Sequence, residues 1–193
     1  MIALDAGVLS VILYPQSPIP KDFKTGLDID HAKERVDQLV EEIRQSGDRI
    51  LIPTPALSEA LVVVAPDVQK YLDELESQAC FKIAVFGTRA AVEIALRVKH
   101  AKQAGDKKEG LLSAWDKVKY DRQIVAIAKV EGATAIYSTD KDVHDHGKLW
   151  GLPVYNLSDL PIPLKQHNLF QEEQRKTEGP KLPAQAADPD DDL

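Results

Sequence analysis

Short runs of consecutive apolar residues recur along the chain and predict five buried β-strands. The predicted strands span residues 2–4, 50–52, 81–86, 135–137 and 153–155. These runs are apolar at nearly every position instead of alternating with polar residues. That pattern is typical of strands that are covered on both faces in a mainly parallel sheet.

Segments with a 3.6-residue apolar period lie between the strands and predict helices. The predicted helices span residues 6–14, 30–46, 54–65, 67–78, 88–103 and 120–131. Asp30 is expected to cap the second helix and Gly47 to end it, while Thr54 followed by Pro55 is typical of a helix start. Polar connections are expected at residues 15–28, 105–110 and 138–147. Helices alternating with short buried strands predict an α/β fold, a three-layer sandwich with a mainly parallel central sheet.

The composition is that of an ordinary soluble globular protein: 193 residues, 44% apolar and 28% charged. Cys80 is the single cysteine, which excludes a disulfide framework and a Cys-rich zinc site. The longest apolar run, residues 60–65, is too short to cross a membrane, and Asp5 lies where a signal peptide would be apolar. We therefore expect a cytoplasmic protein that does not associate with a membrane.

The negative charge is concentrated at the end of the chain. The formal net charge is −7, and residues 171–193 carry seven acids and three bases, which leaves −3 for the first 170 residues. The last segment is rich in Pro and Asp and has few residues to bury. We expect a folded domain over residues 1–163 and a disordered acidic tail over residues 164–193.

Four acids lie at positions where a carboxylate is expected near the core and therefore needs hydrogen-bond donors or a cation. Asp5 and Asp140 follow predicted buried strands, Glu59 lies in the first two turns of a helix, and Asp121 heads another. Each alone is consistent with a helix cap or a turn residue. Four unpaired carboxylates near the core would be costly, and Arg122 cannot neutralise them all. Oxygen-only ligand sets suit Mg²⁺ or Mn²⁺, which point to phosphoryl chemistry.

The segments LDAGVLS, PTPALSEAL, KYDRQIVAIAKVEGA and AIYSTDKDV, in this order, resemble the PIN-domain family, whose commonest small members are VapC-like toxin ribonucleases. The resemblance covers residues 1–160. The chain departs from the family pattern at Gly7, where Ser, Thr or Asn is common, and in its longer loop and tail.

The resemblance implies a metal-dependent endoribonuclease that hydrolyses RNA phosphodiesters and is the toxin of a toxin–antitoxin pair. Asp5, Glu59, Asp121 and Asp140 would be the catalytic and metal-binding residues, with Mg²⁺ or Mn²⁺ as the cofactor. The remaining family positions fall on Ser138, expected to hydrogen-bond a ligand carboxylate, and on Asp142, expected at the edge of the site. A small antitoxin protein would insert a segment into the acidic groove, and the protein would form a homodimer.

RNA binding requires positive charge near the acids. A run of basic residues precedes and follows Asp121, and its members nearest to that acid are Lys117, Lys119 and Arg122. The run also includes Lys99, Lys102, Lys107 and Lys108. The alternative interpretation is a solvated helix face and loop.

Two other functions are consistent with parts of the pattern. A catalytically inactive PIN-fold module would use the same surface to bind RNA or a protein, but it leaves the four acids unexplained. A phosphoacceptor or phosphatase-like domain also places acids at strand ends, yet the paired early acids and the late lysine of such sites are missing. His144 and His146 are spaced two apart in a predicted loop, which is weak support for a metal site, and Cys80 has no evident base to activate it.

Overall fold

The computed structural model describes residues 1–14, 16–64 and 67–163. The strands are β1 (Ile2–Leu4), β2 (Ile50–Pro53), β3 (Phe81–Ala84), β4 (Ile136–Tyr137) and β5 (Val154–Tyr155). The helices are α1 (Ala6–Leu13), α2 (Ala32–Ser46), α3 (Thr54–Val64), α4 (Val68–Ser77), α5 (Thr88–Gln103), α6 (Trp115–Val130) and α7 (Lys141–Trp150), followed by a 3₁₀ turn, Leu157–Asp159. The predicted acidic tail lies outside the described residues, so the boundary at residue 163 stays a prediction.

The five strands form one parallel sheet in the order β3-β2-β1-β4-β5. The chain therefore builds outward from β1 to β2 and β3 on one side, then returns to the other side of β1 to add β4 and β5. In open parallel sheets, ligand sites form at such a reversal of strand order, at the carboxyl ends of the strands. Here the reversal lies between β1 and β4.

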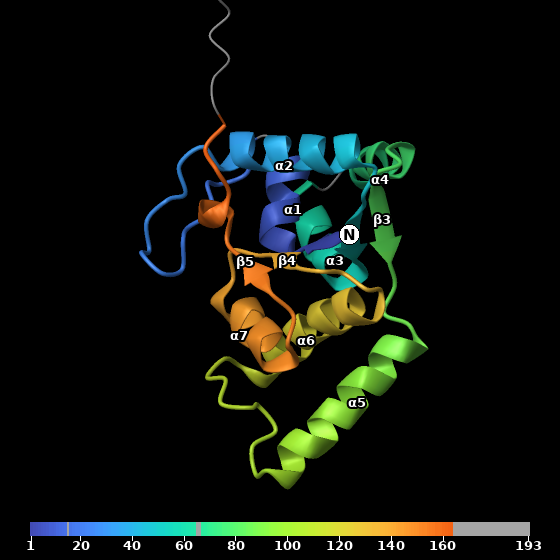
Figure 1. Ribbon diagram of the computed structural model, residues 1–193, viewed down its shortest axis with the longest axis vertical. Helices are drawn as coiled ribbons and strands as arrows, with labels where there is room; N and C mark the ends of the chain where they lie inside the picture. Colours follow the sequence, from blue (N-terminus) through green and yellow to red (C-terminus); the bar gives the residue numbers. More distant parts are fainter. Residues whose placement is uncertain (15, 65–66, 164–193) are drawn as a thin grey trace, which may run out of the picture. The chain divides into compact units, whose positions relative to one another are not determined.

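Helices cover both faces of the sheet, as the uninterrupted apolar strands predict (Figure 1). In β1, Ile2 and Leu4 pack with the residues of α1 and α2, while Ala3 faces the opposite way and packs with those of α6 and α7. β2 divides its side chains in the same way, with Ile50 on one face and Leu51 on the other. The three-layer α/β sandwich is therefore confirmed.

Two of the predicted boundaries were wrong in the region that forms the site. α6 begins at Trp115, not at residue 120, and its N-cap, Ala114, offers no side-chain hydrogen bond that would mark the start. The expected polar connection at 138–147 is largely the helix α7, which buries Val143 and Trp150. Its many polar residues hid that apolar face, although Asp140 caps the N-terminus and Gly151 the C-terminus.

Two smaller expectations also differ from the structure. The N-cap of α2 is His31, in the left-handed region at φ 52°, and Asp30 instead accepts a hydrogen bond from the buried Arg35 at 3.0 Å. β3 ends at Ala84, because Val85, 71% exposed, already lies outside the core.

Within the described residues, we find no helix with the length and apolar character needed to span a membrane.

Candidate active site

Asp5 leaves the end of β1 and is buried, with both carboxylate oxygens engaged. Oδ1 accepts a hydrogen bond from the Ala6 amide at 2.7 Å, which caps α1, and Oδ2 accepts one from the Ser138 hydroxyl at 2.6 Å. Ser138 is itself fully buried just after β4, the strand next to β1. The predicted hydrogen bond from Ser138 to a site carboxylate is therefore present, and it fixes the orientation of Asp5.

Asp140 and Asp142 lie at the start of α7. Asp140 is the N-cap: its Oδ1 accepts a hydrogen bond from the Asp142 amide at 2.8 Å, and its own amide donates to the Ser138 hydroxyl at 3.0 Å. The Asp142 carboxylate accepts a hydrogen bond from Ser113 and lies 2.6 Å from the Lys117 ammonium. The two strand ends and the cap of α7 are thus joined through Ser138.

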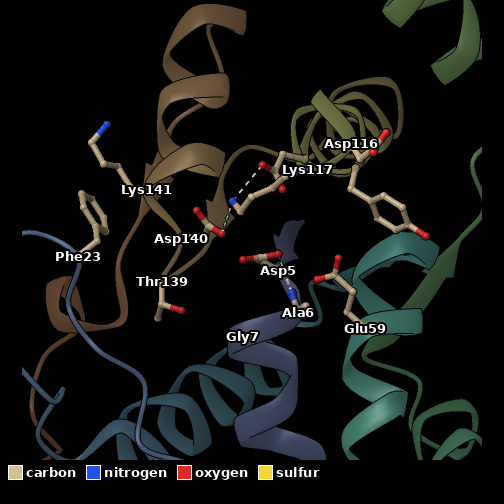
Figure 2. A pocket seen from close by; sticks show the side chains of 12 residues that line it. Asp5, Ala6, Gly7, Phe23, Glu59, Asp116, Lys117, Thr139, Asp140 and Lys141 are labelled. Atoms are coloured by element: carbon tan, nitrogen blue, oxygen red, sulfur yellow. Dashed lines mark hydrogen bonds and ion pairs between the residues drawn. The ribbon is translucent and has the colours of Figure 1, made fainter. Parts of the chain in front are cut away.

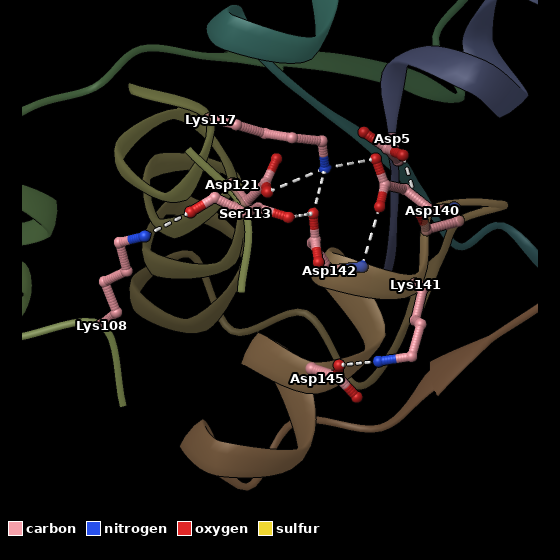
Figure 3. Close-up of polar contacts among 10 residues, drawn as sticks. Asp5, Lys108, Ser113, Lys117, Asp121, Asp140, Lys141, Asp142 and Asp145 are labelled. Carbon is pink, nitrogen blue, oxygen red and sulfur yellow. Dashed lines mark hydrogen bonds and ion pairs between the residues drawn. The ribbon is translucent and has the colours of Figure 1, made fainter. Parts of the chain in front are cut away.

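Asp121 belongs to the second turn of α6 and does not head the helix as the sequence suggested. Its side chain is 9% exposed, and Lys117 lies one turn earlier, with its Nζ 3.3 Å from Asp121 Oδ2. The same ammonium lies 2.7 Å from Asp140 Oδ2 (Figure 3). Sequence reasoning missed this cluster because it assigned Lys117 to RNA instead of to the carboxylates.

Glu59, on α3, is exposed, unlike Asp5 and Asp121. It was expected among apolar residues that face the core or its rim, and α3 places it at the rim of a pocket, with its carboxylate pointing toward Asp5 (Figure 2). The pocket has a volume of about 630 Å³, and all four predicted acids line it. The topology thus brings together residues from β1, α3, α6 and the start of α7.

The pocket lining also includes residues that the sequence did not assign to the site, among them Phe23 and Thr139. Phe23 comes from the loop before α2, and Thr139 precedes Asp140 (Figure 2). A Cβ placed on Gly7 would lie 2.7 Å from the Thr139 hydroxyl. Thr139 therefore fills the space that a side chain at position 7 would take, which explains how this chain accommodates glycine there.

Burial makes negative charge unfavourable in this pocket. It raises the pKa of Asp121 to about 7, although Lys117 lowers it, and it raises the pKa of Asp5 against the hydrogen bonds from Ser138 and Ala6. Burial, with the nearby charge of Asp5, also raises the pKa of Glu59. Three acids that resist ionisation in one pocket form a site that a cation would stabilise.

Within the carboxylate cluster around Lys117, the ionised forms of Lys117 and Asp142 are favoured. Burial opposes the charge of Lys117, but its hydrogen bonds to Asp140 and Asp142 raise its pKa above the usual value. Burial likewise opposes the charge of Asp142, and the hydrogen bonds from Lys117 and Ser113 hold its pKa below the usual value.

The donor set is chemically suited to Mg²⁺ or Mn²⁺, because it consists of carboxylate oxygens with unused lone pairs. In the arrangement seen here, no three Asp, Glu, His or Cys side chains of the described residues converge closely enough to hold a metal ion. The Lys117 ammonium lies within 3.3 Å of a carboxylate oxygen from each of Asp121, Asp140 and Asp142 and acts as their counter-ion.

The three basic residues predicted to contact RNA differ in their placement. Lys117 points into the carboxylates, and Lys119 is exposed, with its ammonium 2.6 Å from Asp116. Arg122 was wrongly expected at the RNA surface: it is 1% exposed, and its guanidinium pairs with Glu109 at 2.9 Å. The helical period turns position 122 into the protein, one residue after Asp121.

Neither His144 nor His146 faces the carboxylate pocket in the manner of a ligand. His144 lies on α7 with Nε2 3.0 Å from the Ser138 carbonyl oxygen, and its ring contacts Phe23. His146 is fully buried on the same helix, and burial, reinforced by the charge of Arg122, lowers its pKa to about 4. Cys80 is buried as a free thiol.

Comparisons with known proteins bear on the fold. No protein-family model matches the chain, and no curated protein matches its sequence. One similar chain comes from the crystal structure of VapBC2 from Rickettsia felis bound to a DNA fragment from the VapBC2 promoter. Its TM-score is 0.51 at 15% sequence identity, and the match covers 81% of this chain and 98% of that chain. The chain has a PIN-like fold.

A second solved structure, DNA-bound VapBC from Salmonella typhimurium, has a TM-score of 0.47 at 14% identity and covers 81% of this chain and 97% of its own. The PIN-like fold was predicted from four short segments, and the Rickettsia structure confirms it. At these identities the likeness concerns the fold, so the activity has to be argued from the pocket itself.

Proposed function

We propose that the protein is a metal-dependent endoribonuclease that hydrolyses RNA phosphodiesters. The observation that carries this proposal is that Asp5, Glu59, Asp121 and Asp140 all line one pocket of a PIN-like fold. These acids would hold Mg²⁺ or Mn²⁺. When bound, such an ion supplies an activated water and stabilises negative charge on a phosphate.

The residues differ in what they contribute. Asp5 is held by Ser138 and Ala6, so its carboxylate is oriented before any ligand arrives. Asp140 is oriented by its role as the N-cap of α7. Glu59, at the exposed rim and with a raised pKa, is placed to orient a water molecule or to accept its proton.

RNA is the substrate class that the pocket supports best. Tyr120, 46% exposed on α6, and Phe23 both line the pocket, and aromatic rings beside a phosphate site can stack with the bases of a single strand. Lys141 and the exposed Lys119 supply positive charge nearby. These features favour a flexible, single-stranded segment over a duplex.

We further propose that the protein is the toxin of a toxin–antitoxin pair and forms a homodimer. The similar chain from Rickettsia felis belongs to a VapBC2 complex, which supports a small antitoxin as the partner here. An antitoxin segment with an Arg or Lys side chain would complement the acidic pocket. Light scattering of the purified protein, alone and with its antitoxin, measures both associations.

The test is cleavage of a mixed pool of short RNAs with Mg²⁺ or Mn²⁺, with and without EDTA. Asp5→Asn and Asp121→Asn are expected to lower the cleavage rate more than tenfold while keeping the wild-type circular dichroism spectrum. The matched control is Asp145→Asn, because Asp145 on α7 pairs with Lys141 and does not line the pocket.

Cleavage that needs the metal and both pocket acids, but not Asp145, would support the nuclease. Equal activity in all variants would refute it. The absence of both cleavage and metal binding in calorimetry would favour an inactive PIN-fold module that binds RNA or a protein.

A further inference from the structure

The ammonium group of Lys117 is enclosed by carboxylates from two helices. Its Nζ lies 2.6 Å from Asp142 Oδ2, 2.7 Å from Asp140 Oδ2 and 3.3 Å from Asp121 Oδ2 (Figure 3). Two of these acids, Asp121 and Asp140, are among the proposed metal ligands. The positive charge of Lys117 therefore lies between two carboxylates that would also have to bind the divalent ion.

The other lysines near the pocket do not place their ammonium groups between Asp121, Asp140 and Asp142. Lys141, which also lines the pocket, turns its ammonium to Asp145 at 2.5 Å, and Lys119 pairs with Asp116 at 2.6 Å. Figure 3 shows Lys141 directed along α7 and Lys117 directed into the acids. Lys117 is therefore the lysine that compensates the buried carboxylates.

We propose that Lys117 competes with the divalent ion, holding the site as a counter-ion until the metal displaces its ammonium. This inference rests on the proposed metal site. A divalent ion and a lysine ammonium cannot occupy the same space between Asp121 and Asp140, and their like charges repel at this separation. Metal binding therefore includes the withdrawal of Lys117.

The surrounding contacts allow this exchange. The Lys117 side chain is 42% exposed and has a flexible four-carbon stem, so it can swing toward solvent. Asp142 keeps its hydrogen bond from Ser113, and Asp140 Oδ1 keeps the Asp142 amide, when the ammonium leaves. Withdrawal thus frees Asp140 Oδ2 for a metal without disturbing the cap of α7.

The experiment is a titration of the full-length protein with Mn²⁺, by calorimetry and by electron paramagnetic resonance of the free ion, in the absence of RNA. Lys117→Met keeps the length of the stem and removes the charge. It is expected to lower the Kd for Mn²⁺ by about tenfold, which corresponds to about 1.4 kcal/mol. Lys117→Arg keeps the charge and is expected to bind Mn²⁺ like the wild type.

Lys129→Met is the matched control, since Lys129 lies on the same helix, pairs with Glu93 and does not line the pocket, and its Kd should stay within about twofold of the wild type. Circular dichroism and thermal unfolding establish that each variant is folded, and Lys117→Gln is the second neutral variant if Lys117→Met does not fold. Equal or weaker Mn²⁺ binding by the neutral variants would overturn the inference, as would a lack of Mn²⁺ binding by every protein.

These readouts separate the inference from the proposed function. Tighter Mn²⁺ binding by Lys117→Met in a protein that cleaves no RNA would support the competition and refute the nuclease. Metal-dependent RNA cleavage by a protein whose Mn²⁺ affinity is insensitive to position 117 would support the nuclease and overturn the competition.

Discussion

His146 makes the stability of the fold depend on pH in a way that can be measured. Its ring is fully buried on α7, and neither ring nitrogen has a hydrogen-bond partner among the described residues. Burial and the charge of Arg122 lower its pKa from 6.5 to about 4 in the folded protein. The unfolded chain therefore takes up a proton first as the pH falls, so the contribution of His146 to stability is complete above pH 6.5 and is lost toward pH 4.

The size of this loss follows from the pKa difference. Each pKa unit corresponds to 1.36 kcal/mol, so a decrease from pH 7.5 to pH 5.0 costs about 2 kcal/mol of the free energy of unfolding. The pocket acids have the opposite effect, because the raised pKa values of Asp5 and Asp121 stabilise the folded protein as they become protonated. The pH profile of the wild type alone thus mixes the two contributions.

The assay that isolates His146 is urea unfolding of the wild type and His146→Leu at both pH values. The stability of the variant relative to the wild type should rise by about 2 kcal/mol between pH 7.5 and pH 5.0, because the contributions of the pocket acids cancel in the difference. His100→Leu is the control, since water reaches the exposed His100 in both states. A pH-dependent change below about 0.5 kcal/mol for His146→Leu would refute the reasoning.

Two glycines give further predictions. A Cβ on Gly147 would overlap with the Val154 side chain and would lie 2.8 Å from the Leu152 carbonyl oxygen. Gly147→Ala should therefore reduce the free energy of urea unfolding by about 2 kcal/mol or more. Lys148→Ala, the control at the next position, should leave it unchanged. Wild-type stability in Gly147→Ala would contradict this packing. A Cβ on Gly7 would contact only the hydroxyl end of the Thr139 side chain, so Gly7→Ala should reduce the free energy of unfolding by about 1 kcal/mol. Adding Thr139→Ala should restore that stability in the double variant. Additive effects of the two substitutions in the mutant cycle would exclude the contact.

Much of the architecture was predictable because it depends on local patterns. The apolar runs at residues 2–4 and 50–52 are buried as strands of the sheet, and Thr54 with Pro55 marks the start of α3. Asp5 and Asp140 could be placed together because the ends of neighbouring parallel strands meet at one edge. Glu59 and Asp121 line the same pocket, with Glu59 exposed at its rim, and their roles stay a prediction.

The contacts that tune the site were not predictable, because they join residues through tertiary packing. Nothing near Lys117 in the sequence indicates that its ammonium meets Asp140 and Asp142, which are more than 20 positions away. The burial of Arg122 depends on Glu109, which lies outside α6. Charge and period alone cannot distinguish a lysine that faces solvent from one that compensates a carboxylate.

The position of β1 in the sheet has a consequence for synthesis of the chain. β1 is made first but lies between β2 and β4, and the hydrogen bond between Asp5 and Ser138 joins residues 133 positions apart. Such distant contacts form only after the intervening chain is available. A nascent polypeptide on the ribosome therefore holds Asp5 and Glu59 without their partners, and the acidic pocket is completed only when translation has passed residue 142.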